Sequence, residues 1–411
     1  MHFLDLPVEM LQYIALFLPI SSIVNLAQTC KHLLDVTTID AIWQQLCYRD
    51  YLVDSKEGWT LTFKEIYTKV LQKCGFLGWK RLALLPYGGL VYVSWGKGEI
   101  QVFRYYPDDS PVDRLYYHLI YSIQWNSEQN DLQVLCQQCK EGAQPALLTQ
   151  GCRNMDGPKY PVICCAAEDC QKMHSQSCIC SRSVRQKNNQ GYTHKRFKKG
   201  FEDHPDAFSA SFKKGYNCPM LPFPPWSEGD QAKCPVQLGL YTADYGSHGV
   251  EILHVHFSVD KPNNLLALKI TGDRNVPAGY TSLTVFLDKP IVLTLADQET
   301  VFDMLTADAA RDEEAYAQLM ASRGEGEEGP DLRQPFAVPL DCVDRGTEPH
   351  STCMARYLGQ GRIAGTYYVH PAVCRCHFIK FSDTKFGVLW LDLRSFSVFH
   401  KAKGLQVDFK T

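Results

Sequence analysis

The chain has 411 residues, of which 45% are hydrophobic and 21% charged, and its formal net charge is −3 at pH 7. This is the composition of a globular protein with room for two or three domains, and so small a charge points to no class of partner. No apolar run reaches the ~18 residues that a membrane helix needs.

The start of the chain lacks the basic region and cleavage site of a secretory signal. The 17 cysteines, an odd count without such a signal, fit reduced thiols better than disulfides. We therefore expect a protein of the cytoplasm, the nucleus or both, with no membrane partner.

Residues 1–50 carry apolar side chains at the spacing of amphipathic helices. Three sets have this spacing: Leu11, Ile14, Ala15 and Leu18; Ile23, Leu26, Ala27 and Cys30; Ile39, Ile42, Trp43 and Leu46. Pro7 suits a first helical turn, Pro19 should end the first helix, and Ser21 and Ser22 should cap the second. Three such helices cannot enclose a core alone, so part of their apolar surface should contact another chain.

The order Leu-Pro-x-Glu, spaced leucines, Ala-x-x-Cys-Lys and then tryptophan resembles the F-box. The matching residues are Leu6, Pro7, Glu9, Leu11, Ile14, Leu18, Leu26, Ala27, Cys30, Lys31, Leu33 and Trp43. In that family the apolar stripe docks on a Skp-type adaptor, which holds a cullin and a RING protein. The resemblance implies adaptor contacts by Leu6, Pro7, Leu11, Ile14, Leu18, Leu26, Cys30 and Trp43. The alternative is an ordinary helical hairpin packed on the chain's own domain.

The rest of the chain is expected to be an antiparallel β-rich sandwich or barrel, which makes the whole an α+β protein with a three-helix N-terminal domain. Residues 51–75 should form a linker, with a helix over 59–74 that Thr62 caps. Short β-branched and aromatic runs predict strands at 90–93, 99–103, 116–125, 250–257, 265–270, 283–287, 291–295, 378–381 and 386–393. We assign 76–295 to this domain, 296–334 to a helical and acidic insertion, and 335–405 to its last strands.

One basic stretch raises the question of nucleic acid. Residues 182–199 hold seven lysines and arginines with almost no acid. They lack the regularly interleaved aromatics of a base-stacking surface, so we interpret them as a basic loop and expect no nucleic-acid partner.

Several β-rich segments resemble the cyclin-D-binding type of substrate domain found with an F-box. They are residues 85–90, 239–252, 269–279, 361–365 and 386–397. The resemblance implies a cup that takes the C-terminal tail of a target, of the cyclin D kind, and carries its pocket over to Lys269 and Asp273.

The residues themselves also favour a binding pocket there. The turn 245–249 has two glycines, and an ammonium beside a carboxylate can hold the polar end of a peptide. We add Tyr245, His248 and Trp390 to Lys269 and Asp273 as expected target-binding residues. The alternative is that Asp273 caps its own turn, Lys269 is solvated and His248 satisfies a local backbone group.

Cysteines concentrate between residues 136 and 180. Two thiolate pairs can complete a tetrahedral zinc shell. The resemblance implies a structural zinc with two cysteines and two histidines. Here Cys136 matches the first ligand, Cys164 and Cys170 keep the spacing of the second pair with cysteine replacing histidine, and Cys139 could supply the remaining ligand, so we predict the ligands Cys136, Cys139, Cys164 and Cys170. Other candidates are Cys165, His174, Cys178 and Cys180.

An enzyme is the rival class. Cys30 with His32 or Cys376 with His377 could be written as a nucleophilic dyad, but sequence neighbours rarely face each other, and no hydrolase, P-loop or zincin motif is present. We therefore expect a non-catalytic substrate receptor of a ubiquitin ligase that marks targets for degradation. A stand-alone binding module or a cysteine-dependent enzyme remains the alternative.

Overall fold

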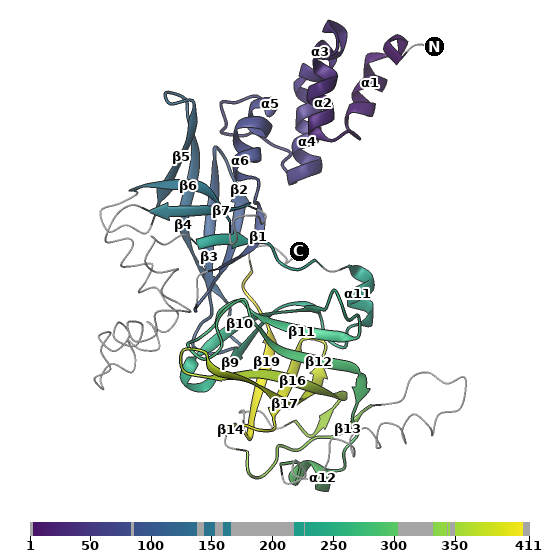
Figure 1. The fold of residues 1–411 in the computed structure, drawn as a ribbon, viewed down its shortest axis with the longest axis vertical. Coiled ribbons are helices and arrows are strands. Elements are labelled where there is room, and N and C mark those ends of the chain that lie inside the picture. The colour runs from purple at the N-terminus through teal and green to yellow at the C-terminus, as the bar shows by residue number, and fades with distance from the viewer. Residues whose placement is uncertain are drawn as a thin grey trace. The chain divides into compact units, whose positions relative to one another are not determined.

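The computed structural model describes residues 3–83, 86–137, 144–152, 159–165, 218–225, 227–302, 332–342, 344–345 and 350–405. Within these ranges, helices precede a large β-rich part (Figure 1). The expected α+β class, with an antiparallel β-rich part after an N-terminal helical domain, is confirmed.

The N-terminal domain has four α-helices where three were expected. They follow the 3-10 turn η1 (Phe3–Asp5) and are α1 (Val8–Ala15), α2 (Ile20–Ala27), α3 (Lys31–Thr38) and α4 (Asp40–Tyr51). The helix that the sequence analysis missed is α3, which buries Leu33, Val36 and Thr37 on one face. The expected serine caps are also wrong, because Pro19 is the N-cap of α2 and both serines lie inside that helix.

The segment after α4 is helical from residue 63 and contains a wider turn. It consists of α5 (Phe63–Glu65), the π-helix η2 (Ile66–Leu71) and α6 (Gln72–Cys74). The expected cap is confirmed: the Thr62 hydroxyl accepts the Glu65 amide, and the Glu65 side chain accepts the Thr62 amide. This reciprocal capping box fixes the start of the helix.

Eight strands form a closed barrel in the order β1 to β8. They are β1 (Gly78–Leu82), β2 (Leu90–Trp95), β3 (Glu99–Tyr106), β4 (Tyr116–Asn126), β5 (Asp131–Cys136), β6 (Gln144–Cys152), β7 (Lys159–Cys165) and β8 (Cys218–Leu221). In β3, Ile100, Val102 and Arg104 alternate with less buried residues, as expected of a strand with one inward face.

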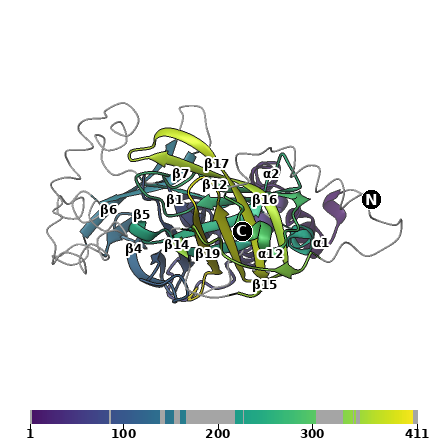
Figure 2. The same ribbon diagram turned by 90° about the horizontal axis from the view of Figure 1, so that it is seen from below.

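A second sheet holds most of the remaining strands. Its elements are β9 (Gly239–Asp244), β10 (Val250–Phe257), β11 (Asn264–Lys269), β12 (Thr281–Pro290), β14 (Asp344–Arg345), β16 (Ala355–Gly365), β17 (Val369–Ser382), β18 (Lys385–Trp390) and β19 (Ser395–Lys401). Their order is β14-β19-β18-β17-β16-β12-β11-β10-β9, and β19 also pairs with β9. Figure 2 shows β16 beside β17 in this sheet.

Smaller elements accompany the sheet: α11 (Glu228–Lys233), η4 (Gly246–His248), α12 (Leu295–Glu299), and the pair β13 (Gln334–Pro335) and β15 (Thr352–Cys353). The strand expected at 291–295 is wrong, because Thr294 caps α12 there. The core of the sheet is apolar and includes Leu253, Phe378 and Phe386.

The chain divides into two compact units. One comprises Met1–Gly78, Tyr92–Phe103 and Leu119–Gln171, and the other Trp79–Val91, Arg104–His118 and Lys172–Thr411. Among the described residues, no helix is both long enough and apolar enough to span a bilayer.

Candidate functional site

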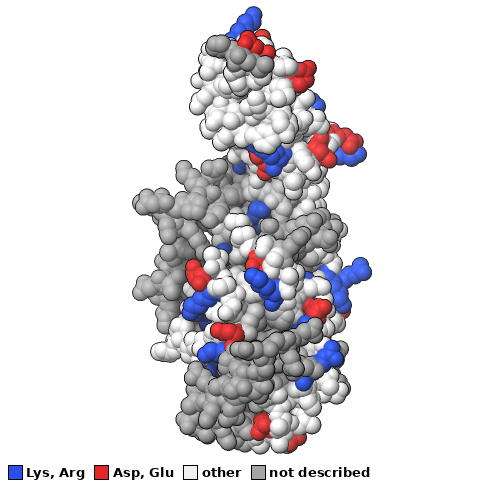
Figure 3. All heavy atoms as spheres, turned by 90° about the vertical axis from the view of Figure 1, so that its right-hand side faces the viewer, with Lys and Arg blue, Asp and Glu red and all other residues white. Residues whose placement is uncertain are grey.

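Helix α1 carries apolar side chains on two faces. Leu11 and Ala15 are buried in the N-terminal domain, whereas Met10, Tyr13 and Phe17 remain 48%, 59% and 71% exposed. These three positions follow one another at i, i+3 and i+7, so they form a stripe along α1 and the turn after it. Over the helices at the top of Figure 3, few charged side chains appear on the face shown. An exposed apolar stripe on so small a domain is typical of a protein-binding surface.

A hollow of about 490 Å³ lies beside this stripe. It is lined by Leu16, Phe17, Gln44, Gln45, Tyr48, Arg49 and Asp54. Arg49 donates hydrogen bonds to the carbonyl oxygens of Leu16 and Leu18, which ties the end of α1 to α4. Tyr48 on α4 is 57% exposed, so the turn after α1 and helix α4 each place an aromatic ring, Phe17 and Tyr48, around one depression.

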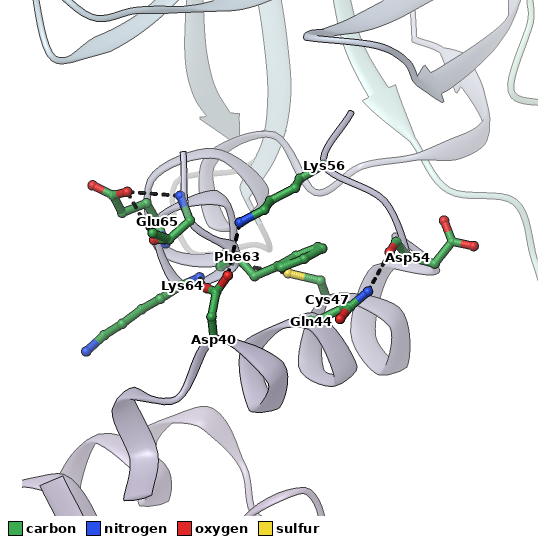
Figure 4. A network of polar contacts seen from close by, with 9 residues as sticks. Asp40, Gln44, Cys47, Asp54, Lys56, Phe63, Lys64 and Glu65 are labelled. Carbon is green, nitrogen blue, oxygen red and sulfur yellow. Dashed lines mark hydrogen bonds and ion pairs between the residues drawn. The ribbon is translucent and has the colours of Figure 1, made fainter. Parts of the chain in front are cut away.

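Polar contacts hold α4 against the segment that follows it (Figure 4). Asp40 pairs with the Lys56 ammonium at 3.1 Å, and the Gln44 amide donates to the Asp54 carbonyl at 3.0 Å. The Cys47 thiol donates to the Phe63 carbonyl at 3.6 Å. Because these contacts extend from the first residue of α4 to its middle, the helix is a fixed support for the hollow.

The expected adaptor residues take up different environments. Leu11 and Trp43 are buried, at 1% and 3% exposed, and the Trp43 indole donates to the Thr37 carbonyl. Pro7 is exposed, and five others are partly buried: Leu6, Ile14, Leu18, Leu26 and Cys30. The sequence analysis did not single out Met10, Tyr13, Phe17 and Tyr48, although the second apolar stripe of α1 was readable at helical spacing.

A buried cluster of charges lies where the target pocket was expected. The Lys269 ammonium is 2.7 Å from a carboxylate oxygen of Asp273 and 2.7 Å from one of Glu251. Lys269 at the end of β11 is 1% exposed, and Glu251 in β10 is 3% exposed. Lys269 is therefore not the solvated residue of the alternative interpretation, and Glu251 is a partner that the sequence analysis missed.

The two carboxyl groups of this cluster differ in pKa. Burial raises the pKa of Glu251 well above its ordinary value, and the nearby Asp273 charge adds to this, against the attraction of Lys269. Burial also acts to raise the pKa of Asp273, but Lys269 and hydrogen bonds from Glu251 and Lys269 lower it to about 2. The cluster therefore favours an ionised Asp273 and a Glu251 that retains its proton.

The loop after β11 is built by its own hydrogen bonds. Asp273 accepts the backbone amides of Asn275 and Val276, at 2.5 and 2.8 Å, so it does cap its own turn. The Thr271 hydroxyl accepts the Ile252 amide at 2.7 Å. Asp273 thus both caps its own turn and pairs with the Lys269 ammonium. The sequence analysis treated these two roles as alternatives, but they occur together.

The turn before β2 is hydrogen-bonded to the same loop. The Pro86 and Tyr87 carbonyls accept the amides of Ala278 and Gly272, at 2.7 and 3.0 Å, and the Gly89 amide donates to the Ile270 carbonyl. Gly88 has a φ of 65°, and a Cβ there would lie 2.2 Å from the Ile270 oxygen. Glycine is therefore required for this close approach.

The three remaining residues expected in the pocket, Tyr245, His248 and Trp390, differ in their surroundings. The Tyr245 ring lies 4.7 Å from the Lys269 ammonium, and burial raises the pKa of its hydroxyl. His248 is exposed in η4, and its charge acts on Asp273. Trp390 is 4% exposed and lies within the core of the second sheet, where its indole donates to the Ser397 hydroxyl.

Comparison with known proteins gives two matching domains. Residues 3–49 match the F-box-like family, and residues 226–404 match the Cyclin D1 binding domain. The chain therefore contains one segment similar to the F-box-like family and one similar to the Cyclin D1 binding domain.

The chain is similar over most of its length to F-box only protein 31. It is 24% identical to the protein of Rattus norvegicus, over 97% of this chain and 84% of the relative. It is 23% identical to that of Homo sapiens and 25% identical to F-box only protein 31-B of Xenopus laevis, in both cases over 97% of this chain and 83% of the relative.

Two of the four predicted zinc ligands lie outside the described residues. Cys136 at the end of β5 is fully buried, and Cys164 lies in β7, opposite Leu147. Cys139 and Cys170 lie outside the described ranges, as do His174, Cys178 and Cys180. Within those ranges, no three His, Cys, Asp or Glu side chains are grouped so as to hold a metal ion. The zinc site therefore stays a prediction.

Two further expectations fall outside the described residues: the basic stretch 182–199, and the acidic stretch 324–330 within the insertion expected at 296–334. Cys376 and His377 are adjacent in β17, where successive side chains point to opposite faces, so they do not form a dyad.

Proposed function

We propose that this chain is the substrate-recognition subunit of a cullin-RING ubiquitin ligase. Its F-box would bind a Skp-type adaptor, its β-rich part would bind a target, and ubiquitin transfer would take place on other subunits. The observation that carries this proposal is the exposed apolar surface of the F-box, which combines Met10, Tyr13 and Phe17 with the hollow beside Tyr48. Aromatic anchors of this kind contribute most of the energy of protein interfaces.

The proposed target is the C-terminal tail of a protein of the cyclin D kind. The match to the Cyclin D1 binding domain supports this, and it includes the Lys269, Asp273 and Glu251 cluster. Holding a target beside the conjugating enzyme raises the effective concentration of its lysines, so such a receptor accelerates transfer without chemistry of its own. Residence in the cytoplasm or nucleus is part of the proposal and rests on the sequence.

The adaptor surface can be tested with exposed residues alone. We expect Tyr13→Ala with Phe17→Ala to weaken adaptor binding at least tenfold, because two aromatic anchors are lost while Leu11 and the domain core stay intact. The measurement is titration of the purified adaptor against the full chain. Val259→Ala removes an apolar side chain that is 86% exposed in the other unit and is the matched control.

Retention of full adaptor affinity by the double variant would refute this assignment of the surface. We expect the same variant to retain target peptides as wild type does, because Tyr13 and Phe17 belong to the other compact unit from Lys269. Loss of both activities with an unchanged unfolding curve would refute the division of labour.

We also propose a structural zinc held by Cys136, Cys139, Cys164 and Cys170. Thiolates suit tetrahedral zinc, and a closed set of four ligands would stabilise the strands and loops that carry them. The proposal is supported by the spacing of these cysteines in the sequence.

A further inference from the structure

The linker, residues 52–75, is fixed to α4 by aromatic contacts. The Tyr67 ring meets the rings of Trp43 and Tyr51 edge-on, at 5.4 and 5.5 Å between ring centres. The Tyr67 hydroxyl also donates a hydrogen bond to the Asp50 carboxylate at 2.6 Å. Tyr67 is 3% exposed, so it packs as part of the N-terminal domain. The linker therefore moves with α4 and is not a free tether.

Two tryptophans join the linker to the turn between β2 and β3. The rings of Trp59 and Trp95 stack at 4.5 Å, with 9° between their planes. Each indole donates to a carbonyl of the other segment: Trp59 to Gly96 at 3.1 Å, and Trp95 to Ser55 at 2.9 Å. Flat rings that stack and also donate to each other's backbone leave the two segments little freedom to slide or tilt.

Two glycines bring the same backbones into direct contact. Gly58 and Gly98 have φ values of 79° and 77°, and a Cβ at Gly98 would lie 2.7 Å from the Gly58 oxygen. A side chain at either position would force the segments apart. Beside them the Lys97 ammonium pairs with Glu57, but these side chains are 76% and 63% exposed, so the ion pair contributes little. The contact therefore depends on the stacked rings and the close backbones.

A second contact joins the linker to the turn between β4 and β5. The Lys73 ammonium in α6 lies 2.8 Å from the Asp131 carboxylate. The Lys69 ammonium lies 3.3 Å from the side-chain oxygen of Asn130 and 5.2 Å from the centre of the Trp125 ring. All these residues belong to one compact unit. Contacts at two different turns restrict a rotation that one contact alone would allow.

A linker held along its length fixes the orientation of the N-terminal domain on strands β2 to β5. In the proposed ligase the adaptor would hold the N-terminal domain, so these strands would also be fixed relative to the conjugating enzyme. A swinging connection would spread the lysines of the receptor over a larger volume. It would thereby lower the effective concentration of each lysine at the enzyme.

We propose that Trp59 and Trp95 are positioning residues. Their stack holds strands β2 to β5 in one orientation on the N-terminal domain, and this orientation sets the rate of ubiquitin transfer. The effect on the rate rests on the proposed function, whereas the fixed orientation is a property of the chain alone. The two parts are therefore tested by separate measurements.

The orientation is measured by double electron–electron resonance on the full chain. Spin-labelled amino acids replace Asp35 in α3 and Glu128 in the β4–β5 turn, which are exposed positions on the two sides of the linker. We expect one narrow distance peak in the otherwise unchanged chain and its loss in Trp95→Ala. Trp95→Phe should keep the peak, since a ring still stacks on Trp59. A broad distribution in the unchanged chain overturns the proposal even if no variant folds, and so does a narrow peak that survives in Trp95→Ala.

The rate is measured in the ligase reconstituted from the full chain, a Skp-type adaptor, a cullin and a RING protein, as transfer of ubiquitin to the chain's own lysines. At saturating conjugating enzyme we expect Trp95→Ala to lower the maximal rate several-fold, with adaptor affinity unchanged, and Trp95→Phe to restore the rate. Lys97→Ala is the matched control. It removes only the exposed ion pair with Glu57 beside the stack, and it should equal wild type in both measurements.

The outcomes separate the two proposals. A normal rate in Trp95→Ala, together with a lost distance peak, overturns the effect on transfer and leaves the receptor function standing. Wild type that binds the adaptor but supports no transfer overturns the proposed function, while the distance measurement still decides the orientation. A loss of adaptor affinity in Trp95→Ala would mean that the N-terminal domain itself is disturbed, and it overturns the positioning role.

Discussion

The cluster at Lys269 holds one cation between two acids, all removed from water. The lowered pKa of Asp273 and the raised pKa of Glu251 both act toward a group with little net charge, which is the arrangement that burial favours. The ammonium then acts chiefly as an internal brace between β10, the end of β11 and the following loop. A peptide that binds here meets a fixed neutral network with polar edges.

Removal of the cation should destabilise the fold far more than neutralisation of one acid. Lys269→Met leaves two buried carboxyls without the cation between them, and we expect it to lower the free energy of unfolding by about 3–5 kcal/mol. The measurement is urea unfolding of the full chain, with the exposed Lys261→Met as control. Glu251→Gln should remain close to wild type, because the amide resembles the protonated acid.

The same unfolding series has a defined pH dependence. Since the pKa of Glu251 is raised in the fold above 4.5, its contribution is fully present below pH 4.5 and is lost as the pH rises through the raised value. Wild type should therefore lose more stability than Glu251→Gln on going to alkaline pH. A parallel dependence in the two proteins would mean that Glu251 is ionised in the fold.

The sequence alone predicted two of the three residues of the buried charge cluster at Lys269. Lys269 and Asp273 stand four positions apart, so a single segment identifies them as a pair. Glu251 joins them only because β10 and β11 are paired with Leu253 opposite Lys269, a register that no local pattern specifies. The sequence did contain one signal for Glu251, which is a glutamate within a strand whose other residues are mostly buried. A search for alternating polar and apolar residues does not detect it.

At the scale of elements, the packing of strands β16, β17 and β18 depends on a glycine whose lack of a side chain makes room for an aromatic ring. Gly361 in β16 lies against the ring of Trp390 in β18, where an added Cβ would come within 2.0 Å of the ring carbon Cζ3. The tryptophan is buried and hydrogen-bonded to Ser397, so it cannot withdraw freely. The glycine therefore sets the distance at which these strands pack.

We expect Gly361→Ala to destabilise the chain by about 1–3 kcal/mol, because the methyl group overfills a packed core. Thermal unfolding of the full chain measures the effect. Gly229→Ala in α11 is the control, since its Cβ would meet only Ser227 at 3.6 Å. Equal melting temperatures for the two variants would contradict this account of the packing.

Strand prediction succeeded where β-branched and aromatic residues cluster. The run 250–257 coincides with β10, and 99–103 lies inside β3. By contrast β16 is rich in glycine and arginine, and β9 was visible only through the family resemblance. Such strands form because both neighbours supply hydrogen-bond partners, which is tertiary information.

For the whole molecule, the zinc proposal predicts a zinc content that can be measured. The four ligands extend from residue 136 to residue 170, and the test uses the full chain. We expect one zinc ion per purified chain, and its loss in Cys136→Ser with Cys164→Ser. Elemental analysis measures it, with Cys30→Ser as control. Stoichiometric zinc in the double variant would exclude this ligand set.

The pairing of β19 with β9 affects how the protein folds while the ribosome is synthesising it. The two strands meet through residues such as Thr242 and His400, which are 158 positions apart. A ribosome adds roughly 5–20 residues per second, so β9 waits roughly 8–30 s for its partner. During that interval its open edge is available to other chains. A message truncated before codon 395 would leave that edge permanently unpaired, and its product should depend on chaperones and be removed by cellular quality control.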